Sequence, residues 1–145
     1  MTSPETATPP ALQSEFLAEI DIEVAKPPQN VGATPAGKRV VFQVAGGRIA
    51  GPHLNGVILP GAGDWVLVEP DGFTRLDVRA TCRLDDGALL YMTYRGVVDP
   101  ASGYFRTTPV FETGAEKYQW LTRLVCVGVG RRTPAGVAYT VHMIR

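Results

Sequence analysis

Cysteine and histidine are scarce in this chain of 145 residues, and charge of neither sign is in excess. The two cysteines, Cys82 and Cys126, lie in apolar segments without metal-like spacing, so we expect free buried thiols in a reducing compartment. The two histidines form no HxH or HxxxH pair, so no metal site is expected. Lys plus Arg and Asp plus Glu both number 14, which favours neither nucleic acid nor an anionic membrane as a partner.

Long hydrophobic runs are also missing. No apolar stretch approaches the roughly 20 residues of a membrane-spanning helix. The opening residues, MTSPETATPPALQS, lack the basic start and apolar core of a secretory signal, so we expect a cytoplasmic protein. The sequence contains no GxGxxG before a helix, no GxxxxGK[ST], no GxSxG and no HExxH. Nucleotide-dependent chemistry is therefore not expected, and we predict no cofactor.

The chain is instead rich in the residues of tight turns, with 16 glycines and 12 prolines. Residues 1–13 are rich in Thr, Pro and Ala and predict a disordered tail, and residues 14–145 predict a single domain. Apolar residues alternate with polar ones almost throughout that domain, which is typical of strands. The segment 113–119 is expected to be at most a turn, and Pro109 to mark an edge or a bulge. Strands are expected at 16–24, 39–45, 64–69, 74–84, 88–97, 104–112, 118–129 and 136–144.

Hairpin-length connections join most of these segments. Asp85-Asp86-Gly87 is a strong hairpin signal, because Asp and Gly accept positive φ. Two segments, 26–37 and 51–63, are predicted as loops. Eight to ten strands so connected indicate an all-β fold, either a barrel or a sandwich. We favour a single closed or nearly closed antiparallel β-barrel, because closure removes exposed strand edges.

Three runs of the sequence carry a family resemblance: GGRIAGPHLNGVILPGAGDW, LDVRATCRLDDGALLYMTYRGV and YFRTTPVFETGAEKYQWLTRLVCVGVG. From about Phe16 to Arg145 the chain resembles domain-of-unknown-function (DUF) family 3237. The resemblance implies a small β-barrel of lipocalin-like appearance and implies no activity. The chain departs from the family at Thr122, where Asn is more usual. Matching positions are Gly46, Gly47, Gly51, Gly56, Asp64, Trp65, Asp77, Arg79, Asp86, Gly87, Tyr91, Arg95, Gly96, Arg106, Phe111, Glu112, Tyr118, Trp120 and Leu121.

Several strands have a polar face that could be either an ordinary solvent face or the wall of a ligand pocket. We interpret these faces as converging on the lumen, with Asp77 pairing Arg79 and Glu112 pairing Arg106. The apolar faces, such as that of Leu90, Met92 and Tyr94, would then point outward and require a partner. Residues expected to bind substrate are His53, Trp65, Asp77, Arg79, Arg95, Arg106, Tyr118 and Trp120.

The candidate catalytic residues are Asp64, Tyr91 and Glu112. Asp64 either caps a turn or acts as a general base, and Glu112 either pairs with Arg106 or is the second acid/base group. Tyr91 would be the acid or hydrogen-bond donor. His53 in the glycine-rich loop could titrate, although a locally bonded turn histidine is more common.

Two functions are compatible with these residues. The first is cofactor-independent acid/base catalysis of the lyase, hydratase, isomerase or cyclase type on an apolar, oxygenated or aromatic metabolite. The second is a non-catalytic small-molecule binding protein. We expect a small-molecule ligand and a homo-oligomer, with a dimer favoured.

Overall fold

A computed structural model describes residues 6–145 of the chain. Residues 6–13 have no helix or strand, and the first five residues of the predicted tail lie outside the described part. In residues 6–145 no helix is long and apolar enough to cross a membrane. The elements are β1 (Ser14–Val24), β2 (Gln29–Thr34), β3 (Gly37–Ala50), β4 (Asn55–Ile58), β5 (Gly63–Val68), β6 (Thr74–Leu84), β7 (Leu89–Asp99), β8 (Tyr104–Glu112), the 3-10 helix η1 (Glu116–Arg123), β9 (Cys126–Arg132) and β10 (Gly136–Ile144).

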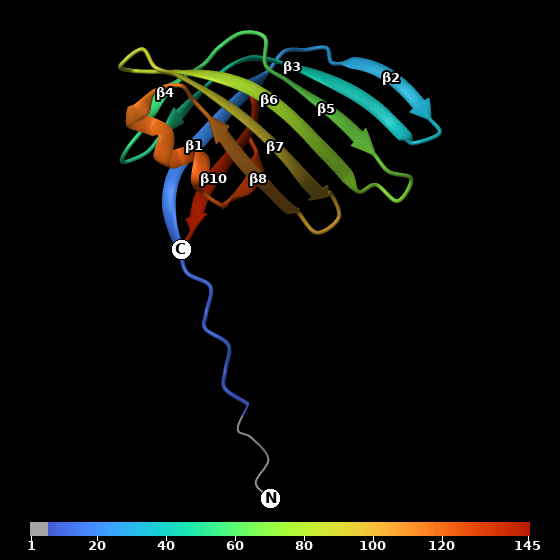
Figure 1. The fold of residues 1–145 in the computed structure, drawn as a ribbon. Helices are drawn as coiled ribbons and strands as arrows, with labels where there is room; N and C mark the ends of the chain where they lie inside the picture. The colour runs from blue at the N-terminus through green and yellow to red at the C-terminus, as the bar shows by residue number, and fades with distance from the viewer. Residues whose placement is uncertain (1–5) are drawn as a thin grey trace, which may run out of the picture.

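The strands close into an antiparallel β-barrel, as the alternation predicts (Figure 1). The barrel has eight strand positions around its circumference, here called staves. Neighbours around the barrel run β1, β10, β9, β8, β7, β6, then β4 and β5 together, then β3, which pairs with β1 again. The short strands β4 and β5 share one stave, because each pairs with β3 on one side and β6 on the other. Strand β2 pairs with β3 and extends beyond the closed part of the sheet.

Apolar side chains on the inner face of every stave form one continuous core. On β6 the buried residues are Leu76, Val78, Ala80, Cys82 and Leu84, at every second position. At one end the barrel is covered by η1, whose buried residues are Tyr118 and Leu121 (Figure 1). The core therefore fills the η1 end of the barrel, and the opposite end, from which β2 projects, carries the cavity described below.

Several expected elements differ from the observed ones. The segment 118–129 is not one strand, because η1 occupies its first part and β9 begins only at Cys126. The glycines at 46 and 47 do not end a strand, since β3 passes through them and shifts register against β1 there. The expected loops 26–37 and 51–63 each contain a strand, β2 and β4, whose pairing with β3 supplies the stability that their own sequences do not. Pro109 lies in β8 beyond the pairs found with β9, at an effective edge of that pairing, where proline is tolerated.

Candidate functional site

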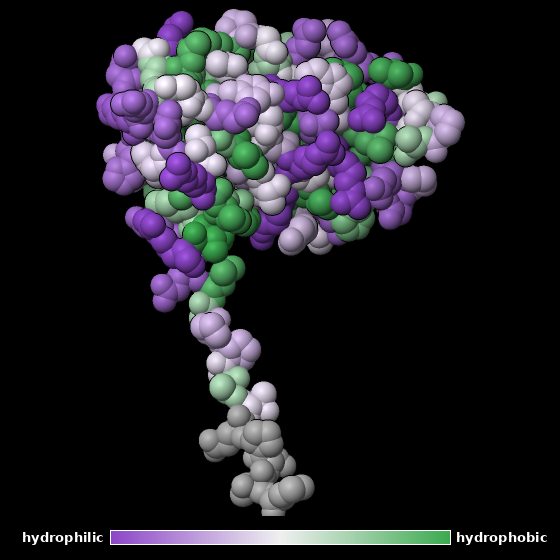
Figure 2. All heavy atoms as spheres, viewed as in Figure 1, coloured by the Kyte–Doolittle hydropathy of each residue, from purple (hydrophilic) through white to green (hydrophobic). Residues whose placement is uncertain are grey.

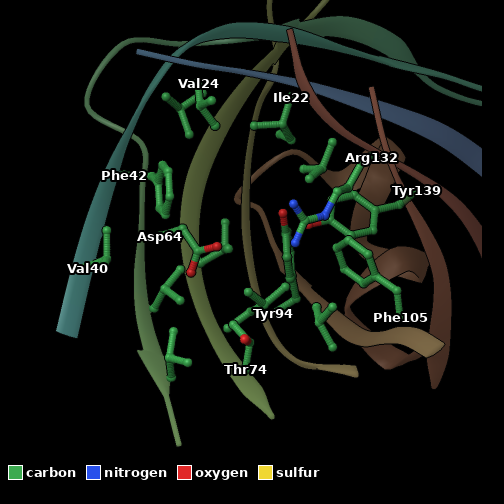
Figure 3. Close-up of a pocket in the computed structure, with 18 residues that line it drawn as sticks. Ile22, Val24, Val40, Phe42, Asp64, Thr74, Tyr94, Phe105, Arg132 and Tyr139 are labelled. Carbon is green, nitrogen blue, oxygen red and sulfur yellow. The ribbon is translucent and has the colours of Figure 1, made fainter. Parts of the chain in front are cut away.

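A cavity of about 320 Å³ lies inside the barrel, toward the end opposite η1 (Figure 3). That volume is at the lower end of the range of small-molecule sites. Most of its wall is aliphatic or aromatic, contributed by the inward faces of β1, β3, β5, β6, β7, β8 and β10. Its polar side chains are few: Asp64, Thr74, Tyr94, Arg132 and Tyr139.

Asp64 projects into this cavity from β5 (Figure 3). Its cross-strand neighbours on the inner face are Phe42 and Val78, so the carboxyl group lies among apolar side chains. Its Oδ1 accepts one hydrogen bond, at 3.0 Å, from the backbone N–H of Asp77. Burial raises the pKa of Asp64 from 3.8 to about 6, outweighing the lowering by that hydrogen bond, and the nearby Asp77 charge raises it further. Asp64 can therefore gain or lose a proton near neutral pH.

Two buried tyrosines, Tyr94 from β7 and Tyr139 from β10, form the wall that faces Asp64 (Figure 3). Their rings pack edge to face, with centroids 5.0 Å apart, and Phe105 packs against Tyr139 in the same way at 5.3 Å. Burial raises the pKa of both phenols above the usual value, so both hydroxyls stay protonated around neutral pH. They are available as neutral hydrogen-bond donors within the cavity.

Arg132, at the end of β9, is exposed and contributes the cation that lines the cavity. Figure 3 shows its guanidinium group reaching over the two tyrosines from the rim. The inner positions of β9 that precede it are Gly128 and Gly130, and a Cβ on Gly130 would lie 2.4 Å from the Phe105 ring. Gly130 lets the Phe105 ring pack directly on the strand backbone, and Gly128 makes room for Thr107.

Of the three predicted catalytic residues, the structure places only Asp64 in the lumen. Tyr91 and Glu112 are exposed and face each other across β7 and β8 on the outside of the barrel. Two-residue alternation identifies two faces of a strand and does not say which one is inside, and the opposite phase was chosen for these strands. The predicted lumen position of both residues is wrong, and a catalytic role for either would lie outside the lumen.

The predicted substrate-binding residues also lie outside the lumen, in two places. Asp77, Arg95 and Arg106 lie with Trp65 along a groove on the outer surface, and Arg79 stacks over Trp65. Among residues 6–145, neither the Asp77–Arg79 nor the Arg106–Glu112 ion pair forms. The remaining residues lie around η1: Trp120 packs edge to face on the exposed His53, and Tyr118 bonds Asp86.

The lumen residues that the sequence analysis missed are Tyr94, Tyr139, Phe105 and Arg132. The predicted outward face contains Tyr94 together with Leu90 and Met92, yet all three are buried inside. A tyrosine within an otherwise apolar alternation is the signal that could have found Tyr94 and Tyr139, because a buried phenol needs a polar partner in the interior.

No three His, Cys, Asp or Glu side chains of residues 6–145 cluster closely enough to hold a metal ion. The groups of the lumen that can take part in proton transfer or anion binding are one carboxyl, two phenols and one guanidinium. Such a set can bind an oxygenated apolar molecule and move a proton on it.

Comparisons with known proteins agree with this fold. The family model described as Protein of unknown function (DUF3237) matches residues 12–103 and 98–144. A UPF0311 protein of Clostridium acetobutylicum is 34% identical over 146 residues, covering 90% of this chain and 92% of that protein.

Solved structures extend the likeness to the whole barrel. A beta-barrel like protein from Acinetobacter baumannii AYE is 32% identical with a TM-score of 0.87, covering 97% of this chain and 100% of that one. A structure described as an enzyme from Penicillium herquei has a TM-score of 0.80 at 21% identity, covering 97% and 99%. At that identity the likeness to the enzyme is one of fold alone.

Proposed function

The chain belongs to the family Protein of unknown function (DUF3237), and from that premise we propose that its lumen performs acid/base catalysis without a cofactor. The substrate class is a small, apolar, oxygenated or aromatic metabolite. The reaction class is that of lyases, hydratases, isomerases or cyclases, in which a proton is removed at one position and returned at another. Such a cycle is balanced without an oxidant or reductant.

One observation carries this proposal: a single carboxyl group with a pKa of about 6 inside an apolar cavity. A general base is most effective when its pKa lies near the working pH, because it is then both ionised and basic. An aspartate that served only to cap a turn would sit at the surface with its usual acidity. Asp64 instead faces the cavity from the middle of the barrel wall.

Each polar group of the lumen has a role in the proposed reaction. Asp64 takes the proton from carbon or from a hydroxyl group and later returns it. Tyr94 and Tyr139, being protonated, donate hydrogen bonds to the oxygen on which negative charge develops. Arg132 attracts the oxygenated end of the substrate at the rim and limits its depth.

A non-catalytic binding protein is the second candidate, and the composition of the cavity favours it. Most of the lining is aliphatic or aromatic, which is typical of pockets that sequester apolar molecules. The two functions differ in one respect, which is whether the Asp64 proton is transferred to or from the bound molecule.

Proton exchange on a bound ketone separates them. The probe is 2-tetralone, an apolar bicyclic ketone whose α-hydrogens exchange with D₂O by general-base catalysis, followed by NMR. The wild-type protein is expected to accelerate exchange. The exchange rate should rise as the pH passes about 6, the pKa of Asp64. Asp64→Asn should lower that rate by about 10²–10⁴-fold, whereas the exposed Asp85→Asn should not. Equal exchange in wild type and Asp64→Asn, with the ketone bound, would assign the protein to binding alone.

We further propose a cytoplasmic location and a dimer. Cys82 and Cys126 are free and buried, which suits a reducing compartment. The outer face of the barrel exposes Val110, Val125 and Val129, which a second copy could cover. The predicted outward apolar face of Leu90 and Met92 does not contribute to a dimer, because both residues are fully buried inside the barrel.

A further inference from the structure

A groove of about 760 Å³ runs along the outer surface of the barrel and is named here the outer groove. It shares only Leu76 with the lining of the lumen cavity. Four arginines line it: Arg39, Arg75, Arg95 and Arg106. Strand register sets three of them in one row, because Leu67 lies between Arg39 and Arg75, and Val97 between Arg75 and Arg106. Figure 2 shows strongly hydrophilic residues gathered over β6 to β8 on this face.

The arginines of the outer groove keep most of their donors free. Arg39 and Arg106 each donate one Nη1 hydrogen bond, at 2.9 Å, to the carbonyl groups of Trp65 and Phe105. Arg75 is paired with Glu69 at 2.7 Å. Within residues 6–145, Arg95 makes no salt bridge and no side-chain hydrogen bond. A guanidinium group has five N–H donors, so several remain available at Arg39, Arg95 and Arg106.

The positive charge of the outer groove is only partly balanced. Asp77 is the one acidic residue on its wall, and it lies directly across from Arg95 in the β6–β7 register. Glu69 offsets Arg75 from outside the groove. The remaining guanidinium groups repel one another, and a bound anion would relieve that repulsion.

Aromatic and aliphatic side chains lie between the charges. Trp65 and Tyr104 are 39% and 51% exposed, so both rings offer a free surface to a ligand. The guanidinium groups of Arg79 and Arg106 stack over them, with distances of 5.7 and 4.7 Å from Cζ to the ring centroid. These cation–π contacts orient the arginines at the groove wall. The outer groove thus combines a planar apolar surface with directed cationic donors.

We infer that the outer groove binds a small organic anion, with its flat apolar body on Trp65 and Val97 and its phosphate or carboxylate on Arg95 and Arg106. The volume is within the range of small-molecule sites. Arginine forks match the geometry of both anions through paired N–H···O bonds. This site goes beyond the proposed reaction, because the strands of the barrel wall separate it from Asp64.

Tryptophan fluorescence measures binding at this site directly. The chain has two tryptophans, so Trp120→Phe leaves Trp65 as the only indole. In that background, phenyl phosphate and benzoate should each change the Trp65 emission saturably. Inorganic phosphate should bind more weakly because it lacks the apolar body. Raising the salt concentration should weaken all three.

Substitution then locates the site. The double variant Arg95→Met, Arg106→Met should weaken phenyl phosphate binding at least tenfold, with circular dichroism confirming that it folds. Arg83→Met is the matched control, an exposed arginine on the neighbouring strand β6 but outside the outer groove, and it should retain the wild-type affinity. No saturable response, or equal affinity in the double variant and the control, would overturn the inference. So would loss of binding in Arg132→Met alone, which would place the anion at the lumen rim.

Discussion

Asp64 and Trp65 are adjacent in the chain and lie on opposite sides of the barrel wall, with contrasting environments. Asp64 faces an apolar cavity, and Trp65 lies outside, against Arg79. Their separation follows from the pleat of β5, which turns successive side chains to opposite faces. At the scale of single residues, this alternation lets one short strand contribute Asp64 to the lumen and Trp65 to the outer groove.

The raised pKa of Asp64 has a direct consequence for stability. The folded protein holds this proton more tightly than the unfolded chain between pH about 4 and about 6, so the free energy of unfolding falls as pH rises through that window. Asp64→Asn removes the titration and keeps an oxygen for the Asp77 N–H. The variant should therefore match wild type near pH 3 and exceed it by about 1–3 kcal/mol above pH 6.

Urea unfolding of both proteins at a series of pH values between 3 and 8 checks this expectation. Asp85→Asn, in the exposed turn between β6 and β7, is the matched control. A stability difference between Asp64→Asn and wild type that stays constant from pH 3 to pH 8 would show that burial does not perturb Asp64.

The helix η1 is attached to the barrel by one small polar cluster. The Tyr118 hydroxyl donates to Asp86 Oδ2 at 2.7 Å, and Lys117 Nζ lies 3.1 Å from the same oxygen. Asp86 belongs to the turn between β6 and β7, so the cluster joins two elements that are distant in sequence. The Tyr118 hydroxyl, then the Ala88 N–H and Lys117, lower the pKa of Asp86 to about 2.

Acid should release η1 before the barrel unfolds. Because the pKa of Asp86 is lowered in the folded state, its contribution is complete above pH about 4 and is lost as pH falls toward 2. The ring NMR signals of Tyr118 should shift with a midpoint near pH 2, the pKa of Asp86. The substitution Tyr118→Phe should reduce the hydrogen-exchange protection of η1 already at pH 7. Tyr104→Phe, at an exposed tyrosine, is the control. Unchanged protection in Tyr118→Phe would mean that apolar packing alone holds η1.

The closure of the barrel depends on a close backbone approach between β1 and β3. A Cβ on Gly47 would lie 2.1 Å from the carbonyl oxygen of Asp21, whereas one on Gly46 would meet nothing nearer than 4.0 Å. Both glycines pair with β1, opposite Ile22 and Glu23. Gly47 also has a φ of +159°, whereas Gly46 has no positive φ, so an alanine at position 47 meets both crowding and backbone strain and one at position 46 meets neither.

Gly47→Ala should reduce the stability of the whole molecule, because the methyl group forces β1 away from β3. The expected loss is about 1–3 kcal/mol, as for other overpacked sites, measured by guanidinium unfolding. Gly46→Ala should change stability much less. Equal effects of the two substitutions would show that the seam tolerates a side chain.

At the scale of the whole molecule, the sequence by itself determined the all-β class and the barrel. Strands β6, β8 and β10 and the Asp-Gly hairpin follow from local signals, namely two-residue alternation and turn residues. From the sequence, Asp64 could be proposed either as a turn cap after a glycine-rich bend or as a general base beside the indole of Trp65. Local chemistry is enough for these features, since strand propensity and turn geometry involve residues that are adjacent in the chain.

Only the tertiary structure decided which face of each strand is inside. An alternating pattern is the same whichever way the sheet curls, so Tyr91 and Glu112 were placed in the lumen, and Tyr94 outside it, by a choice of phase that reverses every side chain. Strands β2 and β4 and the helix η1 likewise depend on contacts that their own sequences do not specify. Both strands pair with the neighbouring strand β3, β4 also pairs with the distant β6, and η1 is bonded to Asp86. Barrel closure buries the more apolar face because removing that surface from water provides the largest favourable free energy. That energy depends on contacts between all eight staves, which no single segment contains.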